Sequence, residues 1–259
     1  MKSRMPPKQL SRILKIWRRV KNKFSEKTTF GKLHIFYRIS DSSYDKEKPS
    51  YVTNKSCIRN CIEAFKTVDF NIIADNVSGE TWSWICNEFS HLYKERTSFG
   101  NGAASFNHAL SSALKLPLDD VVYFIEDDYL HKRNSQNALL EGVKLGADYI
   151  TLYDHPDKYL DTDNPYVDCD GEITKVFLTE SCHWKLTNST TMTFASKIGT
   201  LLHDEMIIRE RTKGTHPDDF NMFGDLFDNG RSLISPIPGY STHGQTDSLS
   251  PLTSWGDLT

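Results

Sequence analysis

The sequence predicts an α/β fold, with an open, mostly parallel sheet of mixed pairing flanked by helices. From residue 31 onward, segments with strand patterns alternate with segments of helical spacing, which is the order that builds a parallel sheet. The clearest of them, 120–125 (DVVYFI), is a short apolar run typical of a buried strand. With 38% hydrophobic and 12% aromatic residues, the 259-residue chain can bury a substantial core. The composition excludes a disordered or collagen-like chain.

The alternation is most regular between residues 31 and 130. The first strand is KLHIFYRI, closed by Ser40 and Asp41, and a helix follows in which apolar residues recur every three or four positions. The third helix is opened by the loop Gly100-Asn101-Gly102. Strands are predicted at 32–39, 69–75, 91–96 and 120–125, and helices at 56–68, 82–89 and 103–115.

The second half has shorter strands of mixed pairing. Pro217 fits the first turn of a helix, and the tail from Ser235, rich in Pro, Gly, Ser and Thr, is predicted to be irregular. Strands are predicted at 147–153, 173–178, 182–186 and 190–195, and helices at 134–145, 196–211 and 220–227.

The first 30 residues form a separate basic segment. Residues 1–27 carry ten Lys and Arg and only Glu26 as an acid. A helix over this segment would bear one apolar arc that includes Trp17, opposite a basic face. Such a helix can lie peripherally on an anionic membrane. A helix docked on its own domain or on a partner, or a frayed tail, is equally consistent with the pattern.

The charge of the remaining chain restricts its partners. The net charge is −3 and residues 1–27 contribute +9, so residues 28–259 sum to −12. An acidic body lacks the basic face of a nucleic-acid binder but suits a divalent cation. Five scattered cysteines indicate reduced thiols, and the chain shows neither a signal-peptide core nor an apolar run near the ~20 residues that span a bilayer. We therefore expect a cytoplasmic protein, with contact to the inner face of a membrane as an open alternative.

The strongest candidate site is the acidic triplet Glu126-Asp127-Asp128 at the end of the buried strand. Strand alternation would point Glu126 and Asp128 to one side and Asp127 to the other. Adjacent carboxylates repel one another unless a cation neutralises them, and oxygen ligands suit Mg²⁺ or Mn²⁺ with a substrate diphosphate. The alternative is an acidic turn that only solvates the strand end.

Three further features are weaker on their own. The loop Gly100-Asn101-Gly102 precedes a helix, whose N-terminus favours an anion. Asp218 and Asp219 begin a later helix, where Asp218 is expected to cap the helix and Asp219 to act as a general base. His243 lies in the tail and could add a nitrogen ligand to a carboxylate-held metal.

Taken in order, these features resemble the nucleotide-sugar glycosyltransferases of GT-A fold. That superfamily has a glycine-containing loop, an acidic DxD at a strand end, an acidic xED at a helix start and a C-terminal histidine. The matching segments are 100–102, 126–128, 217–219 and His243, and the resemblance covers about 32–255. Glu126 stands in place of the first Asp, so Asp128 is expected to be the main direct metal ligand.

The resemblance implies a Rossmann-like nucleotide-binding half (31–130) and an acceptor half (131–259). It implies a UDP-, GDP- or dTDP-sugar donor, Mn²⁺ or Mg²⁺, and a hydroxyl acceptor on a glycan, lipid or protein. Glu126, Asp128 and His243 would hold the metal, while Asp219, next to Asp218, would activate the acceptor and invert the anomeric centre. The residues expected to bind the donor are Arg38, Ser40, Asp41, Asp75, Asn76, Gly100, Asn101, Gly102 and Asp127.

Two other functions remain open on the sequence alone. A sugar-phosphate nucleotidyltransferase shares the sheet and the metal carboxylates, but it usually has a Gly-rich, Arg/Lys-containing loop after its first strand, where this chain has Arg38-Ile39-Ser40-Asp41. A non-catalytic carbohydrate- or cation-binding module would bind no nucleotide.

Overall fold

The structure is a computed structural model in which residues 29–42, 47–160, 164, 167 and 171–258 are described. The basic amphipathic helix expected over residues 1–27 lies outside the described residues.

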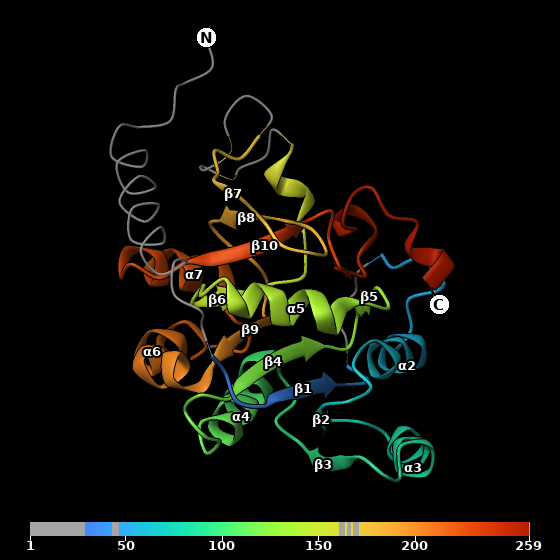
Figure 1. Cartoon of the computed structure of the whole chain (residues 1–259). Coiled ribbons are helices and arrows are strands. Elements are labelled where there is room, and N and C mark those ends of the chain that lie inside the picture. The colour runs from blue at the N-terminus through green and yellow to red at the C-terminus, as the bar shows by residue number, and fades with distance from the viewer. Residues whose placement is uncertain (1–28, 43–46, 161–163, 165–166, 168–170, 259) are drawn as a thin grey trace.

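One large mixed sheet forms the centre of the molecule (Figure 1). Nine of the described strands join it in the order β3-β2-β1-β4-β9-β6-β10-β8-β7, and β5 pairs with β11 in a separate small sheet. The pairs β3-β2, β2-β1 and β1-β4 are parallel, whereas β9 and β8 run antiparallel to their neighbours. The strands are β1 (Leu33–Ile39), β2 (Asp69–Asp75), β3 (Tyr93–Thr97), β4 (Val121–Glu126), β5 (Tyr129–His131), β6 (Tyr149–Ile150), β7 (Val176–Leu178), β8 (His183–Thr187), β9 (Phe194–Lys197), β10 (Leu233–Ile237) and β11 (Ser241–His243).

Helices cover both faces of this sheet, and capping side chains fix the start of some of them. Thr53 and Ser56 form a reciprocal capping box at the start of α2, and Asn101 caps α4 by accepting a hydrogen bond from the Ala104 amide. The longer helices are α2 (Asn54–Ala64), α3 (Gly79–Glu88), α4 (Gly102–Ala113), α5 (Ser135–Lys144), α6 (Ile198–Arg211) and α7 (Asp219–Asp228).

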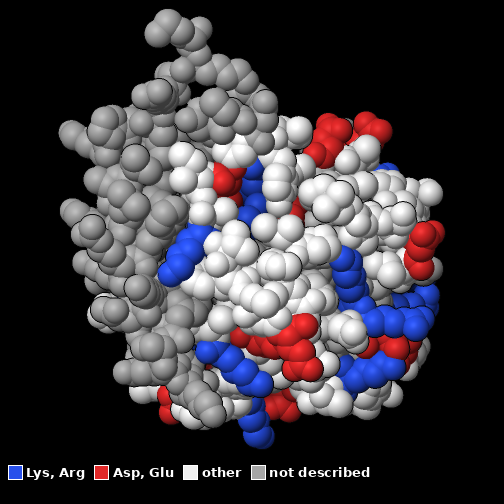
Figure 2. Space-filling model, turned by 45° about the horizontal axis from the view of Figure 1, so that its top comes forward, with Lys and Arg blue, Asp and Glu red and all other residues white. Residues whose placement is uncertain are grey.

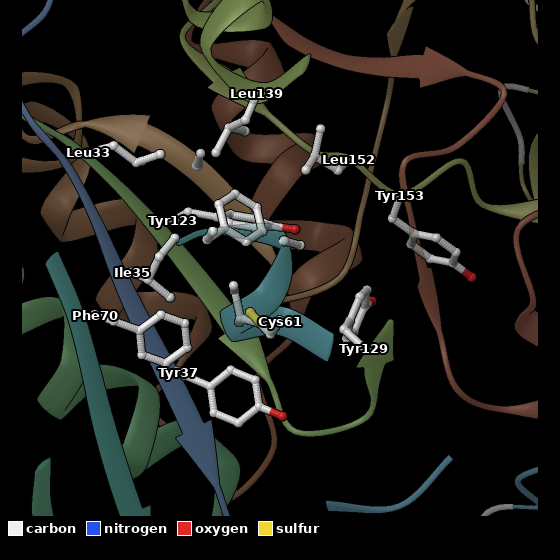
Figure 3. Packing of buried hydrophobic residues seen from close by; sticks show 14 of the residues in the cluster. Leu33, Ile35, Tyr37, Cys61, Phe70, Tyr123, Tyr129, Leu139, Leu152 and Tyr153 are labelled. Carbon is white, nitrogen blue, oxygen red and sulfur yellow. The ribbon is translucent and has the colours of Figure 1, made fainter. Parts of the chain in front are cut away.

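Side-chain alternation along the central strands divides the core into two layers. Ile35 and Tyr37 of β1 pack with α2, α3 and α5, whereas Phe36 between them packs with α4, α6 and α7. Figure 3 shows the first layer, in which Tyr37 and Tyr123 lie close to Cys61 of α2. Both faces of β1 and β4 are buried, and β4 begins with the continuous apolar run 121–125 that the sequence contains.

The predicted α/β class and the open sheet flanked by helices are confirmed. Strand β2 coincides with the predicted 69–75, but β6 covers only two residues of the predicted 147–153. The prediction of an irregular tail from Ser235 was wrong, because β10 and β11 both extend into it. Their partners β8 and β5 are distant in sequence, so the tail gains its strand structure from long-range hydrogen bonds.

The surface carries both charges. On the described part of the face in Figure 2, acidic and basic side chains alternate with uncharged areas. None of the helices in the described part of the chain combines the length and the apolar character needed to cross a membrane.

Candidate active site

A cavity of about 390 Å³ opens at the carboxyl ends of the parallel strands. Ligands bind in this position in open α/β sheets, because the loops after neighbouring strands meet there. Nine residues predicted for the site line it: Arg38, Ser40, Asp75, Gly100, Asn101, Gly102, Glu126, Asp127 and Asp128. The lining as described does not include the other five predicted residues, Asp41, Asn76, Asp218, Asp219 and His243.

The three carboxylates of the acidic triplet have three different partners. Glu126 is the last residue of β4, and its Oε1 lies 3.2 Å from Nη2 of Arg38, its register neighbour on β1. Asp127 Oδ2 accepts a hydrogen bond of 2.7 Å from the Ser40 amide. Asp128 Oδ2 lies 3.1 Å from the Lys48 ammonium. The mutual repulsion of the triplet is therefore reduced by two cationic side chains and one backbone dipole.

The Asp127 carboxylate is still repelled by its neighbour Asp128. Burial and the charge of Asp128 raise the pKa of the Asp127 carboxyl to about 7, although the hydrogen bond from the Ser40 amide opposes the rise. Because this hydrogen bond ties Asp127 to the end of β1, its carboxylate joins the loops after β1 and β4.

His243 reaches the triplet through the small β5-β11 sheet. In that sheet His243 pairs with Tyr129, the residue after Asp128, and this pairing brings its Nε2 to 3.3 Å from Asp128 Oδ2. Ligands in adjacent octahedral positions, each about 2.1 Å from the ion, are about 3 Å apart, so this pair suits two neighbouring ligands of one divalent cation. Both side chains are about 10% exposed.

Glu126, the third metal ligand predicted from the sequence, has a different partner from Asp128 and His243. Glu126 is engaged by Arg38, and among residues 29–42, 47–160 and 171–258 no group of three or more His, Cys, Asp or Glu side chains is arranged to hold a metal. Asp128 and His243 thus offer one oxygen and one nitrogen, and phosphate oxygens of a ligand would complete the coordination. The residues present therefore fit a divalent cation such as Mn²⁺ or Mg²⁺.

Asp75 lines the cavity and also shapes the glycine loop. Its carboxylate accepts hydrogen bonds from Thr97 Oγ1 at 2.9 Å and from the amides of Phe99 and Gly100 at 2.7 and 3.0 Å. Gly100 has φ +71°, a conformation that favours glycine, and it turns the chain into α4. The positive end of the α4 dipole therefore faces the cavity, where an anion is stabilised.

Asp41 and Asn76 are used to connect loops. Asp41 accepts hydrogen bonds from the Ser78 amide and the Thr81 hydroxyl, which fixes the end of β1 to the start of α3. The Asn76 side chain donates to Ser42 Oγ at 2.9 Å. Their predicted role in donor binding stays a prediction.

Asp219 and Asp218 have different surroundings at the start of α7. Burial and the charge of Glu126 raise the pKa of Asp219 to about 6, which places this carboxyl within the electrostatic reach of the triplet. Asp218 occupies the N-cap position without a capping hydrogen bond; its Oδ2 instead lies 3.2 Å from Arg211 Nη1. The expectation that Asp218 caps α7 was therefore wrong, because Arg211 competes for its carboxylate.

Sequence reasoning missed several lining residues. Thr215 and His216 border the cavity because the Thr215 carbonyl accepts a 3.2 Å hydrogen bond from the Ala103 amide at the start of α4. They directly precede Pro217, so extending the predicted acidic motif by two residues would have found them. Lys48 also lines the cavity, but a single lysine in an irregular segment carries no sequence signal.

Comparison of the sequence with protein-family models finds no match, and comparison with curated proteins finds none. Solved structures do match. The crystal structure of GalNAc-T7 with UDP, GalNAc and Mn²⁺ aligns with a TM-score of 0.54 and 11% identity over 83% of this chain and 43% of that chain. S. aureus TarS aligns with a TM-score of 0.47 at 11% identity, over 82% of this chain and 36% of that one. A structure of S. aureus TarS 1–349 in complex with UDP-GlcNAc also gives 0.47, at 12% identity, over 79% and 56%.

The chain has the GT-A fold of nucleotide-sugar glycosyltransferases. The predicted resemblance is confirmed at the level of the fold, and it extends over most of this chain. The chain spans less than half the length of the GalNAc-T7 chain, so the parts of that protein beyond the shared fold have no counterpart in the alignment.

Proposed function

We propose that the protein is a metal-dependent glycosyltransferase that moves a sugar from a nucleotide-diphosphate-sugar to a hydroxyl acceptor. The observation that carries this proposal is the cavity at the strand ends of a GT-A fold, bordered by a glycine loop and the acidic triplet. A protein of the same fold, GalNAc-T7, holds UDP, GalNAc and Mn²⁺ in its crystal structure. We assign donor binding to residues 31–130 and acceptor binding to residues 131–259.

The charges around the cavity support binding of a diphosphate. The N-terminus of α4, the Arg38 guanidinium and the Lys48 ammonium all lie along its wall. A divalent cation held by Asp128 and His243 would stabilise the negative charge that the diphosphate gains as the glycosidic bond breaks. Asp127, tied to the Ser40 amide, joins the loops after β1 and β4 at the wall of the cavity where the donor would bind.

Asp219 is our candidate for the general base. Its pKa of about 6 suits removal of a proton from an acceptor hydroxyl at neutral pH, because the carboxylate is then ionised yet still basic. Attack by that hydroxyl opposite the departing diphosphate would invert the anomeric centre. NMR of the product measures its configuration directly, and retention by the intact enzyme would contradict the role of Asp219 as base.

Calorimetric titration with UDP, GDP and dTDP, with and without Mn²⁺, tests the proposal. We expect one diphosphate to bind in a metal-dependent way, and a panel of its sugar conjugates to be hydrolysed slowly without acceptor. Turnover of a nucleoside triphosphate with a sugar phosphate would instead identify a nucleotidyltransferase. Binding of glycans without any nucleotide would identify a carbohydrate-binding module.

A further inference from the structure

The ammonium of Lys48 lies where a divalent cation would compete with it. Lys48 Nζ is 3.1 Å from Asp128 Oδ2, and His243 Nε2 is 3.3 Å from the same oxygen. The Lys48 side chain is 18% exposed and that of Asp128 is 10% exposed, so water screens this ion pair only weakly. A cation bound between Asp128 and His243 would therefore be repelled by the Lys48 ammonium, which already contacts Asp128 Oδ2.

The backbone next to Lys48 is fixed, whereas its side chain has room to move. The Glu47 carbonyl accepts hydrogen bonds from the amide and the hydroxyl of Thr246 at 2.9 and 3.1 Å. This contact ties Lys48 to the segment that directly follows His243. Lys48 also lines the 390 Å³ cavity, so its ammonium can turn from Asp128 toward that space without displacement of the backbone.

We propose that Lys48 is an exchangeable counter-ion of the site. In the absence of a divalent cation its ammonium pairs with Asp128, and when the cation binds the ammonium moves to pair with the donor diphosphate. The inference rests on the proposed function for the identity of the diphosphate ligand. It follows that Lys48 weakens the binding of the free metal ion and strengthens the binding of the phosphates. The site then binds the ion and the diphosphate more favourably together than the ion alone.

Binding of Mn²⁺ without nucleotide, followed by electron paramagnetic resonance, tests the first half of the proposal. We expect Lys48→Met to bind Mn²⁺ about two- to tenfold more tightly than the unchanged protein, because one partly buried ion pair no longer has to break. Lys48→Arg keeps the charge and should bind Mn²⁺ like the unchanged protein. Lys115→Met removes the same charge from an exposed site and controls for net charge. Equal or weaker Mn²⁺ binding by Lys48→Met, or no Mn²⁺ binding by any variant, would overturn the proposal.

Inorganic pyrophosphate in the presence of saturating Mn²⁺ tests the second half. Lys48→Met should bind it about tenfold more weakly by calorimetry, because one charge-assisted hydrogen bond is lost. If Lys48→Met binds pyrophosphate as tightly as the unchanged protein, the Lys48 ammonium does not pair with the diphosphate. Failure of the proposed function appears differently: no nucleotide-sugar would be hydrolysed or transferred, while Mn²⁺ would still bind more tightly to Lys48→Met.

Discussion

Arg38 and Glu126 are register neighbours on β1 and β4, and their side chains form an ion pair of 3.2 Å inside the candidate active site. Arg38 also donates a 3.0 Å hydrogen bond to the Gly102 carbonyl, which joins the glycine loop to the acidic triplet. Glu126 therefore has a local partner, whereas Asp128 faces the histidine of β11. This difference separates the roles of two carboxylates that stand two residues apart.

We expect Asp128→Ala to abolish Mn²⁺-dependent nucleotide binding, since it removes the oxygen shared by His243 and Lys48. Glu126→Gln should weaken that binding less, because it breaks only the ion pair with Arg38. Calorimetry with the preferred nucleotide measures both effects, and circular dichroism verifies the fold. Equal losses in the two variants would show that Glu126 is a metal ligand as well.

Asp219→Asn should leave donor binding intact and reduce transfer by ~10²–10⁴-fold, the usual contribution of a general base. Asp218→Asn is the matched control, because Asp218 is a neighbouring carboxylate that pairs with Arg211. Near-normal turnover of Asp219→Asn would exclude it as the base.

The rate of transfer should rise with pH. A general base works in its ionised form, and burial together with the charge of Glu126 raises the pKa of Asp219 to about 6. The rate at pH 5 is then about a tenth of its plateau, which is reached above about pH 7. A pH–rate profile measures this dependence. If Asp219→Asn retains the same rise, another group is responsible for it.

Gly244→Ala should weaken Mn²⁺ binding through the backbone. A Cβ at this position would lie 2.6 Å from the Asp128 carbonyl oxygen and 2.4 Å from Val52 Cγ1, so the chain after His243 has to shift away from β5. Gly79→Ala is a suitable control, because a Cβ there meets nothing within 4 Å. Mn²⁺ affinity by electron paramagnetic resonance distinguishes the two, and unchanged affinity in Gly244→Ala would show that this segment adjusts freely.

His131 should make the protein sensitive to mild acid. Burial lowers its pKa from 6.5 to about 3, while Nε2 contacts the Tyr123 hydroxyl at 3.0 Å. The unfolded chain binds this proton below pH 6.5 and the folded protein does not, so stability falls as the pH decreases from 6.5 toward 3. The free energy of unfolding, measured with urea at pH 7 and at pH 5, should differ less between the two pH values for His131→Gln than for the unchanged protein. The exposed His203 offers a control, and His203→Gln should leave that difference unchanged.

The sequence was most informative where local patterns determine structure. The largely apolar segments of β1, β2 and β4 indicate buried strands, and the triplet at the end of β4 identifies the edge of the sheet where the cavity lies. Those signals depend on the hydrophobicity of six or seven neighbouring residues, which a single sequence displays.

The rest depends on contacts between distant segments. The strand that carries His243 has three residues and forms only because β5 pairs with it, so no periodicity could predict it. The division of the carboxylates among Arg38, Ser40 and Lys48 likewise follows from strand register and loop packing. Asp41 and Asn76 lie after strands as predicted, yet their side chains bond to neighbouring loops.

The pairing of β11 with β5 has a consequence for biosynthesis. Strands β1 to β4 have all been synthesised once the ribosome has passed residue 126, but the imidazole beside Asp128 is added only with residue 243. A nascent chain therefore contains strands β1 to β4 long before it contains the histidine that we propose as the second metal ligand. A premature stop after α7 would yield a truncated polypeptide that retains those four strands and lacks His243, the proposed second ligand.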